Sequence, residues 1–478
     1  MREPIVKEYR TDRDSLGEVR IPSEVYWGAQ TQRAIENFPV SGIPMPHEFI
    51  HALALVKKAC ALVNGDLHLL DAELTDAIVR ACDEITDGKY SDQFPVDIFQ
   101  TGSGTSTNMN MNEVIAARAN ELLTGKRQNK SPVHPNDHVN KCQSSNDIIP
   151  TAIHVSARLR IPESLLPALD LLRTTIEKKQ RQYSGVVKTG RTHLMDAMPL
   201  TLEQELSGWS AQVEHAVVDI TGTLSRLEEL AVGGTAVGTG VNAPAEFGAR
   251  VAAKLSDLTK IKFRETANHF EAQSMQNAVV NLSGQLKTFA SGLFKIANDL
   301  RWMNSGPLTG LSEIRLPELQ PGSSIMPGKV NPVIPEAVRM VCVRVMGNDA
   351  VLGMANALGD FELNMMFPLI AHTILESIGI LANASRLLAE KAMRDFEVDE
   401  DHIAEFLERN PILATVLNPR IGYDRSAEVV KKAVHEKKTV KQSVVELGYL
   451  DTRDADEIIN PARMTAPERV HHTQKERS

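Results

Sequence analysis

The residues whose types and spacing best suit chemistry lie in one polar stretch, Gly322–Pro332, which reads GSSIMPGKVNP. Two adjacent serines, one lysine and one asparagine stand there among glycines and prolines. Because prolines remove backbone donors and glycines favour turns, we expect a loop here. Apolar residues at positions 338, 341, 342 and 345 then follow with the spacing of one helix face. A loop that carries a lysine into a helix N-terminus is suited to binding an anion.

Four further polar stretches interrupt segments with helical apolar periodicity. They are rich in small hydroxyl residues, glycine or asparagine, and they are Thr101–Asn108, Gln143–Asp147, Gly190–His193 and Gly233–Gly240. An ordinary turn needs only one or two such residues. Repeated Ser, Thr and Asn side chains instead supply neutral hydrogen-bond donors. With one lysine they suit a small anion with several oxygen atoms, such as a dicarboxylate.

Other kinds of site fit these residues less well. The stretch Gly322–Lys329 has one residue too many for a P-loop, and no GxGxxG motif follows a strand. His134 and His138 are four residues apart, but Pro135 and Asn136 break any shared helix face, which argues against zinc. The Gly-x-Ser-x-Gly motif of serine hydrolases is absent. We therefore expect no metal and no cofactor.

The composition is typical of a globular protein: 42% of the 478 residues are hydrophobic, 24% are charged and the formal net charge is -9. Without a long basic block, we expect neither nucleic acid nor a membrane as partner. The four cysteines lack CxxC spacing and no run approaches about 18 consecutive apolar residues. The charged N-terminal segment is unlike a signal peptide. We expect a reduced, cytoplasmic protein.

The elements that must position the polar stretches are mainly α-helices, several of them longer than twenty residues and without the strand–helix alternation of a parallel sheet. We predict helices over residues 47–67, 74–87, 110–123, 150–183, 200–231, 246–259, 272–302, 333–357 and 363–394. We divide the chain into a mixed, mostly helical domain over 1–140, a central helical bundle over 141–395, and a small helical domain over 396–478 whose tail is expected to fray from 461.

Taken together, these motifs resemble the fumarase/aspartase superfamily. The stretch 322–332 matches the signature GSSxMPxKxNP, and further blocks match TGSGTxxNMNxNE at 101–113, HPND at 134–137, QSSND at 143–147 and GRTHLxDAxPxTLxQE at 190–205. The resemblance implies a three-domain, mainly α fold with a long central bundle. It also implies a homotetramer with a twenty-helix core and active sites shared between three chains. The implied reaction is a reversible anti-elimination that releases fumarate.

Two residues favour the class II fumarases within that superfamily. His193 stands in GRTHL, where aspartases usually carry glutamine, and Gly328 stands where aspartases usually carry alanine. The expected reaction is therefore the interconversion of L-malate with fumarate and water. Leu319–Gln320 and Val333–Glu336 resemble some aspartases, so aspartate ammonia-lyase is kept as the alternative. Argininosuccinate and adenylosuccinate lyases are less similar.

The resemblance implies a role for each residue of the site. Ser323 would take the Cβ proton as an alkoxide stabilised by backbone N–H groups of its loop. Lys329 and Asn331 would bind the carboxylate as its charge grows. His193, paired with Glu336, would act on the departing hydroxyl or serve as the second acid/base group. The groups expected to bind substrate also include Ser103, Gly104, Thr105, Ser144, Ser145, Asn146, Thr192 and Ser324.

A second dicarboxylate site described in the family is matched by His134, Asn136 and Asp137. His138 departs from the family pattern, because relatives often carry an aspartate there. Two rival hypotheses reuse the same fold: a non-catalytic binding protein, and an anion sensor acting through this second site. The first would be expected to lack the reactive serine, lysine or histidine of the catalytic site. All three are present, which favours an enzyme.

Overall fold

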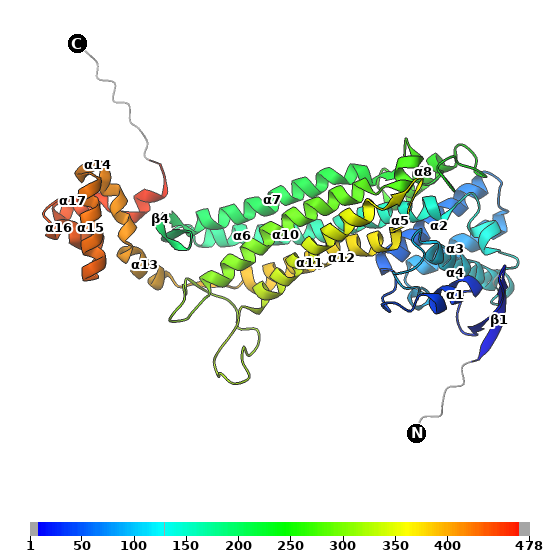
Figure 1. Cartoon of the computed structure of the whole chain (residues 1–478), viewed down its shortest axis with the longest axis horizontal. Helices are drawn as coiled ribbons and strands as arrows, with labels where there is room; N and C mark the ends of the chain where they lie inside the picture. The colour runs from blue at the N-terminus through cyan, green and yellow to red at the C-terminus, as the bar shows by residue number, and fades with distance from the viewer. Residues whose placement is uncertain (1–7, 129, 468–478) are drawn as a thin grey trace, which may run out of the picture. The chain divides into compact units, whose positions relative to one another are not determined.

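The structure is a computed structural model, and it describes residues 8–128 and 130–467. Most of these residues lie in helices, and the described strands form two-stranded pairs (Figure 1). All of these pairs are antiparallel except that of β5 with β6, which is parallel. The prediction of a mainly α protein is thereby confirmed.

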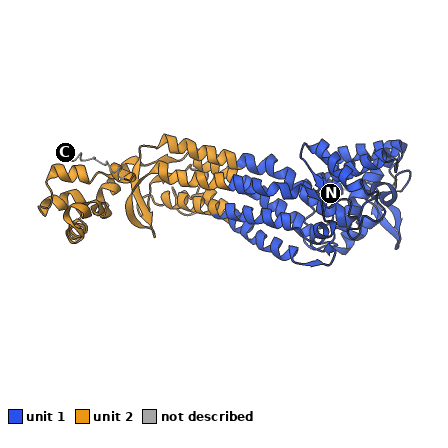
Figure 2. Ribbon diagram, turned by 90° about the horizontal axis from the view of Figure 1, so that it is seen from above, with its two compact units in different colours: residues 1–168, 216–291, 341–383 blue, residues 169–215, 292–340, 384–478 orange. Residues whose placement is uncertain are grey.

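The chain forms two compact units, coloured separately in Figure 2, and each is assembled from separate stretches of sequence. Unit 1 comprises residues 1–168, 216–291 and 341–383, and unit 2 comprises residues 169–215, 292–340 and 384–478. All the boundaries fall inside helices, namely α6 (Leu166–Gln182), α7 (Leu202–Leu227), α10 (Asn277–Met303), α11 (Val333–Asn356) and α12 (Phe367–Leu388). The division into three consecutive domains stays a prediction.

Helices α2, α3, α4, α5 and α8 pack together in unit 1 (Figure 1). They do so because apolar residues recur at helical spacing, as Phe49, Leu53 and Val56 do on α2, where all three are fully buried. The elements of this unit are β1 (Tyr9–Asp14), β2 (Gly17–Pro22), α1 (Ala29–Asn37), α2 (His47–Asp66), α3 (Ala72–Thr86), η1 (Ser91–Gln93), α4 (Thr105–Thr124), η2 (Pro135–Val139), α5 (Ser145–Arg160), η3 (Ile161–Leu165), β5 (Glu229–Leu230), α8 (Phe247–Thr259), β6 (Arg264–Glu265), α9 (His269–Ser274), β8 (Gly359–Asp360) and β9 (Leu363–Asn364).

Unit 2 carries a hairpin and a group of short helices with their own apolar core. That core includes Leu413, Leu417, Val429, Val440 and Val444. The elements of this unit are β3 (Val187–Thr192), β4 (Met195–Thr201), β7 (Ile314–Arg315), η4 (Ala389–Met393), β10 (Glu397–Val398), α13 (Glu400–Arg409), η5 (Pro411–Leu417), α14 (Asn418–Ile421), α15 (Tyr423–Glu436), α16 (Val440–Glu446), α17 (Thr452–Ile458) and η6 (Pro461–Thr465).

Several local predictions need correction. Helix α5 begins at Ser145, five residues before the predicted start at 150, because Ser144 caps it. Helix α4 begins five residues before the predicted start at 110, because Gln100 Oε1 accepts from both the backbone N–H and the hydroxyl of Thr107 and so holds the first turn. The predicted helix over 272–302 is interrupted, since Met275 is extended between α9 and α10. The tail expected to fray from 461 instead forms η6, where Thr465 O accepts from Gln204 Nε2 at 2.8 Å. Residues 468–478 lie outside the described residues.

One described helical run, Phe367–Met393, is long and apolar enough to cross a membrane by length and composition. The sequence had led us to expect no such run. Of its most apolar window, 67% is buried inside the protein, as in the core helix of a globular domain. Its length and composition therefore carry little weight as evidence for a membrane span.

Candidate active site

A ring of local hydrogen bonds closes the loop that begins at Gly322, in unit 2. Gly322 N donates to Lys329 O at 2.9 Å, and Asn331 Nδ2 donates back to Gly322 O at 2.8 Å. Lys329 Nζ donates to Asn331 Oδ1 at 2.7 Å, so two predicted substrate-binding side chains touch each other. A Cβ on Gly322 would lie 2.3 Å from Lys329 O, so only glycine fits this closure. The loop then feeds α11, with Glu336 in its first turn.

The hydroxyl oxygen of Ser323 accepts two backbone hydrogen bonds from its own loop. Ile325 N donates at 3.2 Å and Met326 N at 3.0 Å. Two preorganised donors aimed at one oxygen lower the free energy of negative charge on that oxygen. Ile325 is 83% exposed and the neighbouring Ser324 is also exposed. The two N–H donors are the stabilisation that a serine alkoxide in an exposed loop would need.

Thr192 and His193 lie at the tip of a β-hairpin, where the sequence had predicted a loop. His193 and Leu194 connect β3 to β4 with φ angles of 56° and 61°. A two-residue connection of type I′ requires positive φ at both positions, which normally selects glycine or asparagine. For other residues this conformation costs about 1–3 kcal/mol. The strained, exposed tip is thus a functional candidate on its own geometry.

A buried ion network lies at the base of this hairpin, and the sequence reasoning missed it. Lys188 Nζ is 2.6 Å from Glu205 Oε2 and 2.8 Å from Glu313 Oε2, and Arg191 Nη1 is 2.8 Å from Glu313 Oε1. The side chains of Lys188 and Glu313 are 1% and 5% exposed. Two cations balance two carboxylates, which offsets the cost of burying them. The network ties the hairpin to the segment that precedes the 322–331 loop.

The predicted His193–Glu336 pair is not formed within this chain: no hydrogen bond or ion pair joins them in the described parts of unit 2. Both side chains are exposed. The pairing stays a prediction.

In unit 1, the N-termini of α4 and α5 meet through a chain of hydroxyl groups. The Oγ atom of Ser103 lies 2.8 Å from Thr105 Oγ1, which lies 2.7 Å from Ser145 Oγ. Ser145 Oγ donates to Asn146 Oδ1 at 3.4 Å, and Gly104 turns the chain into α4 with a φ of 72°. Four predicted substrate-binding side chains, far apart in sequence, are therefore brought together. Two helix N-termini in contact also favour an anion.

The buried Asp147 carboxylate holds the start of α5 in place, a role that was not predicted from the sequence. Its carboxylate accepts from Ser144 N at 2.9 Å, from Gly233 N at 3.0 Å and from Thr235 N at 3.1 Å. Ser144 in turn caps the helix by accepting from Asn146 N at 3.2 Å. Burial raises the pKa of Asp147 to about 6, while the three N–H donors favour the charged form. The uncharged glycine-rich stretch thereby supports the QSSND motif.

The three residues of the predicted second site lie around one helical turn, η2. His134 Nδ1 accepts from Asn136 N and Asp137 N, both at 3.2 Å. His138, the residue that departs from the family pattern, accepts from His134 N through its Nδ1 at 2.8 Å and so helps to close the turn. Burial lowers the pKa of His138, which favours the neutral, accepting ring.

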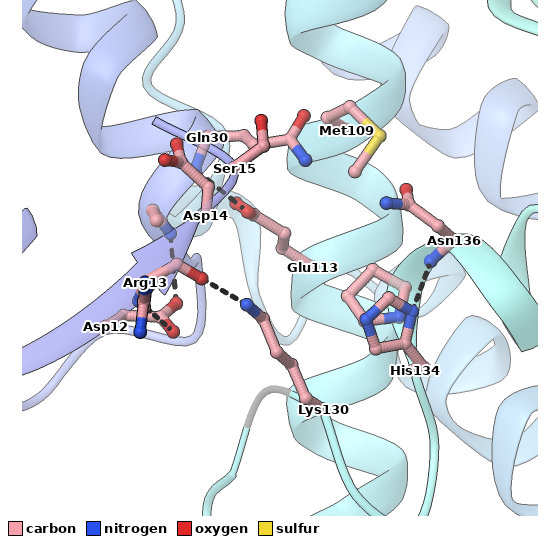
Figure 3. A pocket seen from close by; sticks show the side chains of 12 residues that line it. Asp12, Arg13, Asp14, Ser15, Gln30, Met109, Glu113, Lys130, His134 and Asn136 are labelled. Atoms are coloured by element: carbon pink, nitrogen blue, oxygen red, sulfur yellow. Dashed lines mark hydrogen bonds between the residues drawn. The ribbon is translucent and has the colours of Figure 1, made fainter. Parts of the chain in front are cut away.

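His134 and Asn136 line a pocket of about 230 Å³ (Figure 3). Its walls come from β1, α1, α4 and the segment before η2, and they carry Lys130 as well as acidic groups. The Glu113 carboxylate in this pocket already accepts from Gly28 N and from the Thr31 hydroxyl. Asp137 lines a different pocket of about 840 Å³, together with Asn136 and Ser144. Unit 1 thus divides the second site between two pockets, and Asn136, which lines both, lies with Asp137 beside Ser144 in the larger one.

Among the described residues, no cluster of three His, Cys, Asp or Glu side chains is arranged to hold a metal ion. Lys57 and Asn140 were also missed by the sequence reasoning. The available signal for Lys57 was a lysine at an apolar helix position, between the buried Leu53, Val56 and Cys60.

Comparison with known proteins gives consistent matches along the chain. A lyase family model matches residues 17–347, and a model of the fumarase C C-terminus matches residues 413–466. A class II fumarate hydratase from Xylella fastidiosa is 52% identical over 457 residues, covering 96% of this chain and 95% of that protein. The corresponding protein from Mycobacterium tuberculosis is 51% identical over 446 residues, covering 93% of each chain.

Solved structures agree with these matches. A class II fumarase from Schistosoma mansoni has a TM-score of 0.94 and 42% identity, covering 97% of this chain and 100% of that chain. A fumarate lyase:delta crystallin from Brucella melitensis bound to cobalt has a TM-score of 0.92 and 43% identity, covering 96% and 100%. The resemblance found in the motifs is confirmed: the chain belongs to the lyase family and, within it, to the class II fumarases.

Proposed function

We propose that this protein is a hydro-lyase that interconverts L-malate with fumarate and water by anti elimination and addition. Its similarity to class II fumarate hydratases over nearly the whole chain supports this reaction. The observation that carries the proposal is the pair of backbone N–H groups on Ser323 Oγ, six residues before Lys329. A base and a cation for the growing charge are thus held on one short loop.

In the proposed elimination, the Ser323 alkoxide takes the C3 proton of L-malate. The electron pair of that C–H bond moves onto the adjacent carboxylate, where Lys329 and Asn331 bind the added negative charge. The pair then forms the carbon–carbon double bond as the C2–O bond breaks. His193, supported by Glu336, provides the proton with which the hydroxyl leaves as water. Hydration of fumarate runs through the same steps in reverse.

The substrate carboxylates are bound, in this proposal, by the hydroxyl chain at the starts of α4 and α5. Neutral donors and two helix N-termini favour a dianion without neutralising it. The residues assigned to substrate binding in unit 1 are Ser103, Gly104, Thr105, Ser144, Ser145 and Asn146, and Thr192 and Ser324 of unit 2 are assigned to it as well.

We further propose a homotetramer in which each site takes residues from three chains. An apolar stripe on the part of α11 that lies in unit 1 supports assembly: Val343, Val351 and Met354 are 58%, 36% and 70% exposed, and Gly347 lies between them. Thr192, His193 and most of the 322–331 loop are exposed as well, as expected of residues that meet a partner chain. We also propose a cytoplasmic location, in keeping with four free cysteines.

The decisive experiment incubates the purified protein separately with L-malate and with L-aspartate and follows the ultraviolet absorbance of fumarate. We expect absorbance to grow with malate and not with aspartate. Growth with aspartate alone would overturn the hydratase proposal in favour of an ammonia-lyase. Tight dicarboxylate binding without turnover of either compound would favour the sensor hypothesis.

Assembly is tested by placing a charge on the α11 stripe. Val351→Glu should dissociate the tetramer in light scattering and abolish turnover, because a buried unpaired carboxylate is costly. Val434→Glu is the matched control, since Val434 is 61% exposed on α15 and is not part of the stripe. A monomer with full activity would contradict shared active sites.

A further inference from the structure

Lys57 is a buried cation that the proposed chemistry does not use. It lies in the middle of α2 with 0% exposure, among the fully buried Leu53, Val56 and Cys60. In the described parts of the chain, its ammonium forms no ion pair with a carboxylate. Burying an ammonium costs several kcal/mol even after relaxation. A lysine at such a position therefore calls for a role that a leucine would not fill.

The ammonium is held by two neutral amide oxygens that come from the segment before α5. Lys57 Nζ donates to Asn140 Oδ1 at 3.0 Å and to Gln143 Oε1 at 2.9 Å. The Gln143 side-chain amide cannot flip by 180°, because its Nε2 donates to Val139 O and Lys141 O, both at 3.0 Å. Its oxygen must therefore face the lysine.

Asn140 is fixed in the same way. Its Nδ2 donates to Gln143 O at 3.2 Å. Its Oδ1 accepts from Asn108 Nδ2 and Asn112 Nδ2, both on α4 and both at 3.1 Å, in addition to the lysine. The segment 139–143 is thus wrapped around one ammonium, with both amide side chains oriented by it.

This segment ends where the proposed substrate-binding residues begin. Gln143 directly precedes Ser144, which caps α5, and Ser145, whose hydroxyl joins Thr105. The same amides also reach α4 through Asn140, so Lys57 connects to both helix N-termini of the unit 1 half of the site.

We propose that Lys57 is a positioning residue for substrate binding: through Asn140 and Gln143 it holds Ser144–Asn146 in the conformation that receives a substrate carboxylate. The inference rests on the proposed function. Its positive charge also offsets the negative charge of the nearby Asp147, so that the helix N-terminus keeps its preference for an anion.

The protonation of Lys57 makes this role measurable. Burial lowers its pKa to about 8. The titratable groups that face it are Asp147 on α5, Cys60 on α2 and Cys82 on α3. Burial raises the pKa of both thiols, to about 12 for Cys82 and further for Cys60, so they stay neutral, while Asp147 is charged above a pH of about 6. Between pH 7 and 9, Lys57 is therefore the group in this cluster that loses its charge.

The test compares Lys57→Met with the wild-type protein. Methionine keeps an apolar stem that is one atom shorter, but it removes the ammonium that donates to both amide oxygens. We expect the KM for L-malate to rise about tenfold and kcat to change less than threefold in the variant. We also expect the wild-type KM to rise across pH 8, and this rise to be absent from the variant. Lys58→Met is the matched control: it removes the next lysine on α2, which pairs with Asp83 at 2.5 Å, and should change KM less than twofold.

A purely structural role would lower the melting temperature without the KM-specific, pH-linked effect. A folded Lys57→Met tetramer with unchanged KM and an unchanged pH profile would overturn the inference. If the variant does not fold, wild-type binding of succinate between pH 7 and 9 decides the question, since affinity that does not fall across pH 8 also overturns it. Failure of the wild type to turn over malate would instead sink the proposed function.

Discussion

The two halves of the proposed site are held in different ways. In unit 1, the hydroxyls of Ser103, Thr105 and Ser145 bond to one another across two helices, above the buried Asp147 and Lys57. In unit 2, the 322–331 loop is exposed and bonds mainly to itself. The first half is thus preorganised by packing between helices, whereas the second takes its local geometry from hydrogen bonds within its own loop.

Two glycines make the same distinction. A Cβ on Gly102 would lie 1.9 Å from Met365 O, a backbone atom of a remote segment. A Cβ on Gly322 would instead meet Lys329 and Asn331, which belong to its own loop. The close backbone approach at Gly102 therefore belongs to the packing between distant segments of unit 1. The close approach at Gly322 closes a single loop of unit 2. Loss of a close backbone approach in the first half should therefore appear as lost stability, and in the second half as lost turnover.

The largest effect is expected for Ser323→Ala, which removes the oxygen that accepts from Ile325 N and Met326 N. We expect kcat to fall by about 10²–10⁴-fold, the range for loss of an acid/base group. The melting temperature should stay unchanged, because the loop is exposed. Fumarate absorbance and a thermal melt measure the two quantities. Ser324→Ala should cost far less, and a near-wild-type rate for Ser323→Ala would refute the role assigned to this serine.

Asp147→Asn tests whether the carboxylate buried beneath the N-terminus of α5 ionises in the folded protein. Burial raises the pKa of Asp147 from 3.8 to about 6, so the folded state keeps a proton that the unfolded state has lost between these values. The free energy of unfolding contributed by this group is therefore greatest below pH 4 and falls as pH rises through 6. This difference in pKa between the folded and unfolded states corresponds to about 3 kcal/mol.

The asparagine variant cannot ionise and should lack this fall. Chemical denaturation of both proteins at several pH values between 4 and 7 measures it. The stability of the wild type relative to the variant should decrease as pH rises. A difference that is the same at every pH would mean that Asp147 does not titrate in this range, and the contrast with the exposed half would weaken.

The smallest effects come from a matched pair of glycine substitutions. Gly102→Ala should lower stability by about 1–3 kcal/mol, the usual cost of overpacking, and so lower the melting temperature. Gly322→Ala makes the same chemical change but should leave the melting temperature nearly unchanged and lower kcat/KM about tenfold, since small misplacements of catalytic groups are costly. The reverse outcome, stability lost at Gly322 and activity alone at Gly102, would break the comparison.

Much of the fold follows from local sequence. Helix α2, with its apolar period, lies within one residue of its predicted bounds, and Gly88 ends the helical segment of α3 with a φ of 78°. The start of α4 was wrong because a side chain five residues upstream, Gln100, caps it. The hairpin at His193 was missed because a polar loop and the tight turn of a hairpin are built from similar residue types, so composition does not distinguish them.

The proposed site likewise has features that depend on local sequence and features that depend on tertiary packing. By itself, the sequence determined the chemical groups, the family, and the loop around Ser323, because these depend on residue type and on neighbours a few positions away. Only the tertiary structure decided that Thr105 meets Ser145, that Lys57 meets Asn140 across 83 residues, and that Arg191 meets Glu313 across 122 residues. Hydrogen bonds and ion pairs act over about 3 Å, so their partners are chosen by how distant helices pack, and the periodicity of a sequence reports burial but not the partner.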